Sequence, residues 1–240
     1  MTEPAVALTD FALAAEAAYF ANFVYRRRGA SPGSAGWLVL FFMSVGVAAL
    51  VGGLVHGFFQ QSRPDGKSAL WRLTLLAIGT ATLAKWSIGA RMLLQPAAAR
   101  LVTRIAMLQF IAYAITTLFY FQGFLIAVLD NAPAAIFLLV AMALTYRRRR
   151  DPRFAAGAAG MGLTLLAGLL QQQRVGLHAD HFNHNAVYHV LQGIALYLVF
   201  LGAIAVLDEP RRSSTSEDDE DGRGPDDRMV LGETAHANAT

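Results

Sequence analysis

Long runs of apolar residues are the feature that most constrains what this chain can fold into. A helix that crosses a membrane needs ~20 consecutive, mostly apolar residues, and 55% of the 240 residues are hydrophobic while only 15% are charged. Seven apolar segments can be drawn, over about residues 8–25, 37–59, 69–94, 101–129, 133–150, 154–170 and 190–207. The sequence therefore predicts an all-α fold, a polytopic membrane bundle of seven transmembrane helices.

The limits of two regions follow from local composition. The fifth segment is short if it begins at Pro133, so the turn before it could instead lie near Gln122. Beyond Leu207 the chain becomes charged and rich in serine, and ten of its 17 acidic residues lie in 208–240. We therefore expect a transmembrane domain over 1–207 and a disordered, acidic cytoplasmic tail over 208–240.

Basic residues in the loops predict the orientation, because lysine and arginine are enriched in cytoplasmic loops. The first, third and fifth loops hold most of them, namely Arg26–Arg28, Arg91, Arg100, Arg104, Arg147–Arg150 and Arg153. We expect the N-terminus outside and a multi-pass protein of the bacterial cytoplasmic membrane. The basic excess indicates contact with anionic membrane lipids and no nucleic acid partner.

Four of the six histidines lie within residues 178–189, where the last apolar segment begins. The predicted topology places His189 near the outer surface, and His56 lies at a similar depth on the second helix, ~6 Å below that surface. The same outer layer should contain Asp10, Glu16, Arg72 and Asp130. Ionisable residues inside a membrane are candidates for a functional site.

Imidazole side chains suit zinc, and a catalytic zinc takes three protein ligands and one water. The candidate ligands are His56, His184 and His189. Because residues five apart are about 140° apart around an ideal helix, His184 can share a metal with His189 only from a helix cap or a bulge. His181 is an alternative, since it returns to within ~80° of His189. A nearby carboxylate would accept a proton from the metal-bound water.

The two histidine elements resemble those of the seven-helix hydrolase superfamily that includes alkaline ceramidases and the progestin and adiponectin receptor proteins. That superfamily has Ser-x-x-x-His on the second helix, Asp on the third and His-x-x-x-His at the start of the seventh. His56 matches the second-helix histidine, and residues 183–189 resemble the seventh-helix element. The resemblance implies a zinc-dependent amide hydrolase acting on lipid. Whole-chain similarity to an uncharacterised bacterial membrane family is the alternative.

The sequence departs from the superfamily pattern at three places. Gly52 stands where the serine is expected, Asn185 lies four residues before His189, and the third helix has no Asp. Glu16, Asp10 or Asp130 could replace that carboxylate, and Glu16 is our candidate base. Two of the polar residues have simpler expected roles: Asp10 follows Thr9 at the expected helix start, where a helix cap is favoured, and Lys85 is expected to extend to the inner membrane surface.

Together these features predict an integral-membrane, zinc-dependent hydrolase that cleaves an amide bond of a lipid-like substrate near the outer membrane face. The alternative is a non-enzymatic sensor or small-solute carrier whose histidines are structural or respond to pH. The chain has no cysteine, which excludes disulfides and thiolate chemistry. Its lysines, Lys67 and Lys85, both lie outside the last helix, which excludes a retinal protein.

Overall fold

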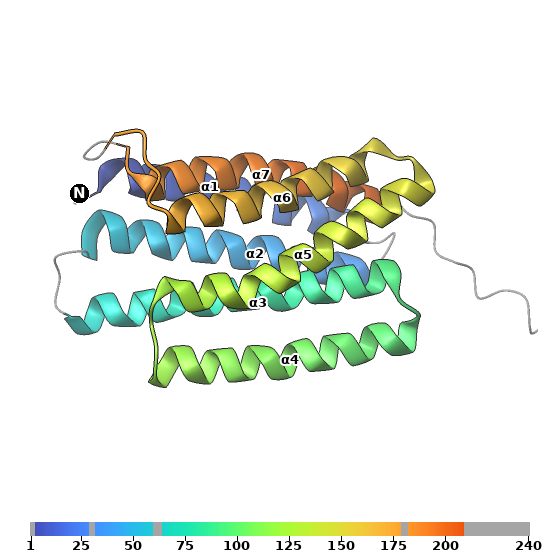
Figure 1. Cartoon of the computed structure of the whole chain (residues 1–240), viewed down its shortest axis with the longest axis horizontal. Coiled ribbons are helices and arrows are strands. Elements are labelled where there is room, and N and C mark those ends of the chain that lie inside the picture. Colours follow the sequence, from blue (N-terminus) through green and yellow to red (C-terminus); the bar gives the residue numbers. More distant parts are fainter. Residues whose placement is uncertain (1–2, 29–31, 60–63, 179–181, 209–240) are drawn as a thin grey trace, which may run out of the picture. The chain divides into compact units, whose positions relative to one another are not determined.

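Seven α-helices make up the part of the chain that the computed structural model describes, residues 3–28, 32–59, 64–178 and 182–208 (Figure 1). The helices are α1 (Pro4–Arg26), α2 (Pro32–Leu54), α3 (Pro64–Leu93), α4 (Pro96–Phe119), α5 (Phe124–Arg149), α6 (Pro152–Gln172) and α7 (His184–Leu207), and a π-helical turn, η1 (Val55–Phe59), extends α2. These described residues contain no strand beyond an isolated bridge between His178 and Phe182. The all-α prediction is confirmed, whereas the predicted acidic tail lies outside them from residue 209 onward.

Proline marks where most of the helices begin. A proline occupies the first position of α1, α2, α3, α4 and α6, where its missing N–H would have no partner inside the helix and its fixed φ suits the first turn. Pro133 is the exception, because it lies inside α5, as transmembrane helices tolerate. The connection between α4 and α5 therefore falls at residues 120–123, near Gln122, and a helix start at Pro133 is wrong.

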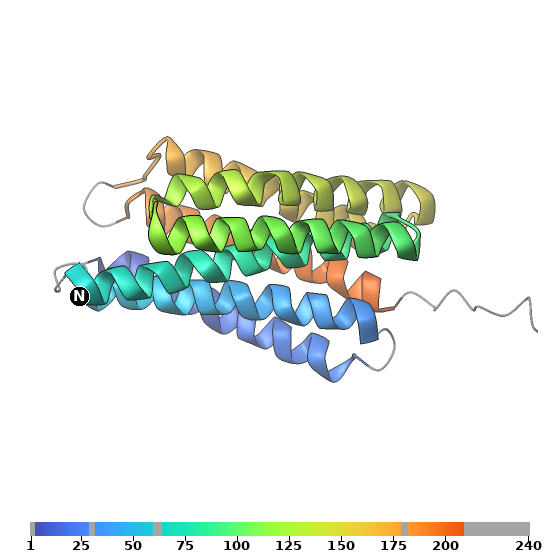
Figure 2. The ribbon, with the colours of Figure 1, turned by 90° about the horizontal axis from the view of Figure 1, so that it is seen from below.

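Six of the helices form a closed ring around a common interior. Contacts join α1 to α2, α2 to α3, α3 to α5, α5 to α6, α6 to α7, and α7 back to α1, whereas α4 packs on the outside of α3 (Figures 1 and 2). Successive helices run in opposite directions. α1 and α7 therefore begin at the end of the bundle where α2 and η1 finish. We call this end the histidine end and the opposite end, where α5 finishes in Arg147–Arg149, the arginine end.

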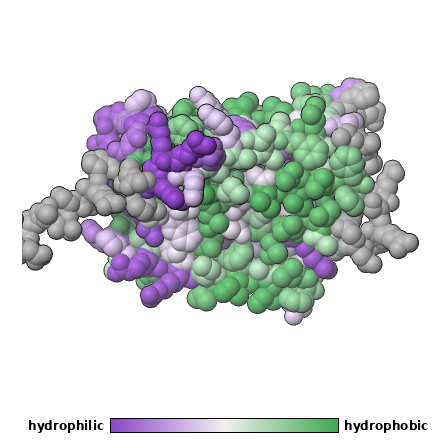
Figure 3. Space-filling view, turned by 180° about the vertical axis from the view of Figure 1, so that it is seen from behind, coloured by the Kyte–Doolittle hydropathy of each residue, from purple (hydrophilic) through white to green (hydrophobic). Residues whose placement is uncertain are grey.

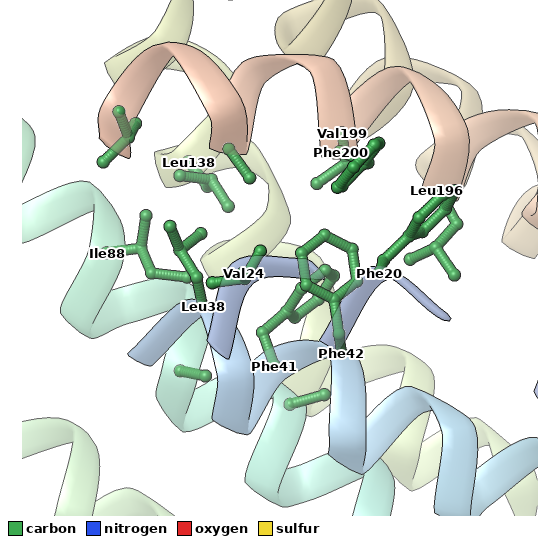
Figure 4. Close-up of a cluster of buried hydrophobic side chains, with 14 of the residues drawn as sticks. Phe20, Val24, Leu38, Phe41, Phe42, Ile88, Leu138, Leu196, Val199 and Phe200 are labelled. Carbon is green, nitrogen blue, oxygen red and sulfur yellow. The ribbon is translucent and has the colours of Figure 1, made fainter. Parts of the chain in front are cut away.

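Aromatic packing closes the ring toward the arginine end (Figure 4). Phe20 of α1 stacks on Phe200 of α7 with ring centroids 4.1 Å apart. The ring of Phe42 from α2 meets both edge-on, at 5.6 and 6.1 Å. Ring pairs of this kind add to the free energy gained from burial itself. The core thus fixes α1, α2 and α7 together and leaves the histidine half of the ring free to contain a cavity.

The outer surface of the described helices is suited to lipid. Six helices, all except α1, are long and apolar enough to cross a membrane. The outward face of α4 carries Leu101, Ile105, Leu108, Ile111, Ile115 and Phe119. Figure 3 shows apolar surface across the middle of the molecule and hydrophilic residues gathered toward one end. The protein is therefore a multi-pass membrane bundle, and a seventh span by α1 and the orientation stay predictions.

Candidate functional site

A cavity of about 260 Å³ lies inside the ring toward the histidine end. All six ring helices contribute lining residues, and no described residue of α4 does. Its lining includes charged or polar side chains at two levels: Asp10, His56, His184, His189 and Gln192 toward the histidine end, and Lys85 with Asn131 farther inside. Apolar residues such as Leu13, Val45, Ile78 and Ala81 form much of the wall. Charged groups inside a membrane bundle are costly, so their convergence on a cavity indicates a functional site.

Asp10 and His189 form the first acid–imidazole pair in the cavity wall. The distance between His189 Nε2 and Asp10 Oδ1 is 3.2 Å. Asp10 is only 3% exposed, and its Oδ2 has no hydrogen-bond partner among the described residues. Asp10 is thus a buried residue in the second turn of α1, which begins at Pro4, and the predicted helix-cap role is wrong.

The hydrogen bonds of Thr9 favour a tautomer of His189 in which a proton lies between the side chains of Asp10 and His189. The Thr9 hydroxyl has a single hydrogen, which it donates to the carbonyl of Ala5 or Val6 at 2.9 Å. The same hydroxyl oxygen lies 3.4 Å from His189 Nδ1 and can accept from it when Nδ1 is protonated. With Nδ1 protonated, Nε2 of a neutral ring is an acceptor facing a carboxyl oxygen. Asp10 and His189 therefore need a shared proton, and the pair is a proton donor held in the wall of the cavity.

Glu3 and His56 form the second acid–imidazole pair. Glu3 Oε2 lies 2.5 Å from His56 Nδ1, and the backbone N–H of Glu3 donates to the carbonyl of His56. The other carboxylate oxygen of Glu3 accepts from the side chain of Asn183, which also caps α7. A carboxylate on Nδ1 fixes the tautomer and the orientation of an imidazole. Nε2 of His56 is left without a described partner, in a side chain that lines the cavity.

Two glycines bring α1 close enough to α2 to place Asp10 in the site. A Cβ added at Gly52 would lie 3.4 Å from Asp10 Oδ2, and one at Gly53 would lie 2.8 Å from the Phe11 ring and 3.0 Å from the Cβ of Asp10. The carboxylate of Asp10 thus lies beside Gly52.

Lys85 lies inside the ring and not at the membrane surface. It is only 5% exposed, lines the cavity and donates from Nζ to Asn131 Oδ1. The expected extension to the inner surface is therefore wrong. Helical Cα–Cβ bonds tilt toward the helix N-terminus, which for α3 is the histidine end, so the side chain is directed back into the ring.

The predicted zinc ligands do not form a three-residue site among the described residues. No group of three or more His, Asp or Glu side chains there could hold a metal ion. The ring centroids of His56 and His189 are 6.5 Å apart. His184 is the first residue of α7 and lines the cavity, but among the described residues no hydrogen bond or ring contact joins it to His56 or His189. His181 lies outside the described residues, and a zinc site is therefore not supported by this arrangement.

The two predicted catalytic carboxylates lie away from the cavity lining. Glu16 of α1 faces α7, where its Oε2 would lie 3.2 Å from a Cβ at Gly193. Asp130 accepts from Gln109 Nε2 of α4 at 2.8 Å. Lys85 and Asn131 line the cavity instead, and Glu3 reaches it only through its contact with His56. In the sequence, Glu3, Lys85 and Asn131 stand out only as polar residues within or just before an apolar segment.

Comparison with known proteins identifies a family for this chain but indicates no activity. The chain matches no curated protein and no solved structure. Residues 5–208, which cover all seven helices but the first residue of α1, match the model of a family described as "Family of unknown function (DUF6962)". Because the match spans most of the chain, the protein belongs to the DUF6962 family.

Proposed function

We propose that the protein is an integral-membrane hydrolase that cleaves an amide bond of a lipid-like substrate in the cavity of the ring. One observation carries the proposal: two acid–imidazole pairs, Glu3–His56 and Asp10–His189, meet in one cavity with ring centroids 6.5 Å apart. Both imidazoles line the same cavity of about 260 Å³, which has room beside the rings for a reacting carbonyl group and a water. The resemblance of His56 and of residues 183–189 to the seven-helix hydrolases supports the same class of reaction.

The two pairs have complementary roles in the proposed reaction. Nε2 of His56, oriented through Nδ1 by Glu3, accepts a proton from water as the water oxygen attacks the carbonyl carbon. The proton shared by Asp10 and His189 passes to the leaving nitrogen as the C–N bond breaks. The products are a carboxylic acid and an amine, and transfer of the proton from His56 back to Asp10–His189 restores the starting state. The chemistry needs one base and one acid, and the cavity supplies one of each.

Turnover of a substrate panel by purified protein in lipid nanodiscs tests the proposal. Release of carboxylic acid from N-acyl amides of graded chain length is measured for the wild type, Asp10→Asn and the matched control Glu16→Gln, whose side chain lies outside the cavity lining. We expect Asp10→Asn to lower the rate by at least about 100-fold and Glu16→Gln to retain it. Absence of turnover in the wild type, with or without added zinc, or loss of turnover only in Glu16→Gln, would overturn the proposal.

Metal analysis of the same preparation separates acid–base from metal chemistry. One zinc per chain, lost in His56→Ala, would replace the acid–base account with a zinc-dependent one. No zinc in a preparation that turns over substrate would support the acid–base account.

A small-solute carrier is the second candidate function. It is favoured by the contact of Lys85 with Asn131 deep inside the ring, because buried ionisable residues also line solute pathways. Uptake of a solute into proteoliposomes, abolished in Lys85→Met and unaffected by Asp10→Asn, would favour the carrier over the hydrolase.

A further inference from the structure

The ammonium group of Lys85 lies at the inner end of the cavity, where its surroundings compensate its charge only in part. Among the described residues, no carboxylate lies within 4.0 Å of it. Its neighbours are Asn131 Oδ1, which is neutral, and the face of the Phe41 ring, 5.7 Å from Nζ. Asp130 acts on it electrostatically but is not among the lining residues and is hydrogen-bonded to Gln109. A buried cation with such partial compensation is costly.

Lys85 and Asn131 together present two kinds of donor to the cavity. The ammonium has three N–H groups, and the described contacts use one of them, on Asn131 Oδ1. The same Asn131 oxygen lies 3.5 Å from the Thr82 hydroxyl, so the amide is oriented with its oxygen toward α3. The NH₂ group of Asn131 then points away from α3, in a side chain that also lines the cavity. Both side chains line the cavity and keep unused N–H groups, which the oxygens of a carboxylate can accept.

Apolar residues line part of this cavity. Its lining on α2 and η1 runs from Val45 to His56, eleven residues or ~16 Å along a helix. A second cavity of about 180 Å³ shares Ile78, Phe124, Asn131 and Tyr188 with the first and is bounded by α6 on its other side. Asn131 thus stands between a cavity whose wall is partly apolar and a second cavity whose wall is mostly apolar. An amphipathic molecule would have room for its chain along the apolar residues of either.

We propose that Lys85 and Asn131 bind the carboxylate of an amphipathic ligand whose apolar chain lies in the cavity. One cation balances one carboxylate, whereas a phosphate monoester carries about −1.5 to −2 charges and would leave negative charge buried. The inference rests on the proposed function for the statement that this ligand is substrate or product. Binding itself does not require turnover.

The test is a binding titration of the full chain in phosphatidylcholine nanodiscs, followed by the fluorescence of its tryptophans, of which Trp71 lines the cavity. Decanoate, decyl phosphate and decanol are titrated into the wild type, Lys85→Met and Arg91→Met, which removes an exposed cation from the same helix. We expect Lys85→Met to weaken decanoate binding by at least about tenfold, to leave decanol binding unchanged, and Arg91→Met to match the wild type.

Equal binding of decanoate by the wild type and Lys85→Met would overturn the inference, and so would tighter binding of decyl phosphate than of decanoate. Should Lys85→Met fail to fold, Lys85→Arg and Asn131→Leu provide the same comparison, with decanoate affinity retained in the first and weakened in the second. Decanoate binding without amide hydrolysis would refute the proposed function alone, and hydrolysis without preference for decanoate over decanol would refute this inference alone.

Discussion

At the scale of single residues, the site depends on polar side chains buried where an apolar group would be more stable. Asp10 is the extreme case, because one of its carboxylate oxygens has no hydrogen-bond partner among the described residues. Such an arrangement lowers the free energy of unfolding. Residues that reduce stability at a site are expected where function requires them.

Asp10→Asn should therefore stabilise the protein while it abolishes turnover. The amide needs no proton shared with His189, because its own NH₂ group can donate to His189 Nε2, which lies 3.2 Å from Asp10 Oδ1. We expect the free energy of unfolding to rise by roughly 1–3 kcal/mol, measured as an increase in Tm in detergent. A decrease in Tm would mean that a bound cation compensates the carboxylate in the wild type.

At the scale of elements, the close approach of α1 to α2 determines where Asp10 lies. Gly53→Ala places a Cβ 2.8 Å from the Phe11 ring and 3.0 Å from the Cβ of Asp10, so α1 must shift. We expect a loss of about 1–3 kcal/mol in stability together with slower turnover. Gly36→Ala is the matched control on α2, because a Cβ there meets nothing within 4 Å. Equal effects of the two substitutions would show that the contact between the helices does not position Asp10.

The start of α6 offers a pH-dependent prediction at the opposite end of the bundle. Asp151 caps α6 by accepting from the Arg153 N–H at 2.9 Å, and Arg153 also pairs with Asp208 after α7 at 2.5 Å. The side chain and the backbone N–H of Arg153 lower the pKa of Asp151 below 3.8. The stabilisation is thus complete above the unfolded-state pKa and is lost as the pH falls through the folded-state pKa.

We expect Tm to drop in the wild type as the pH is lowered below about 4, and to drop less in Asp151→Asn, which has no carboxylate to protonate. The two Tm curves, measured from pH 7 to pH 3, should converge at low pH. Parallel curves would show that Asp151 does not stabilise the start of α6.

The elements differ in how far sequence alone could predict them. Runs of apolar residues located every helix, because length and hydrophobicity decide membrane helices. Pro133 misled because proline ends helices in water but is tolerated inside membrane helices. Among the candidate site residues, His56, His184 and His189 do line one cavity. Three residues were not predicted, namely Glu3, Lys85 and Asn131. Their roles depend on which helices are neighbours, and the pattern of apolar residues does not specify which helices pack together.

At the scale of the whole molecule, the arginine end and the histidine end should face opposite sides of the membrane. The chain has no cysteine, so single cysteines report orientation without background. We expect Leu177→Cys, in the exposed connection between α6 and α7, to react with an impermeant maleimide on intact cells. Leu94→Cys, in the connection between α3 and α4, should react only after lysis. The reverse pattern would place the histidine end in the cytoplasm.

The ring also explains why residues in and just before α1 meet residues in and just before α7. α1 and α7 are in contact, and this closure brings Glu3 and Asp10 to Asn183 and His189. The proposed hydrolysis requires both acid–imidazole pairs to act on the same amide bond. Side chains that act as a unit give strongly non-additive effects on the rate.

The most direct measurement is the hydrolysis rate of His56→Gln, His189→Gln and the double variant, with His178→Gln as a histidine outside the cavity lining. Each single substitution should lower the rate by at least about 100-fold, the double variant should be no slower than the slower single one, and His178→Gln should match the wild type. A wild-type rate in either His56→Gln or His189→Gln would contradict the account.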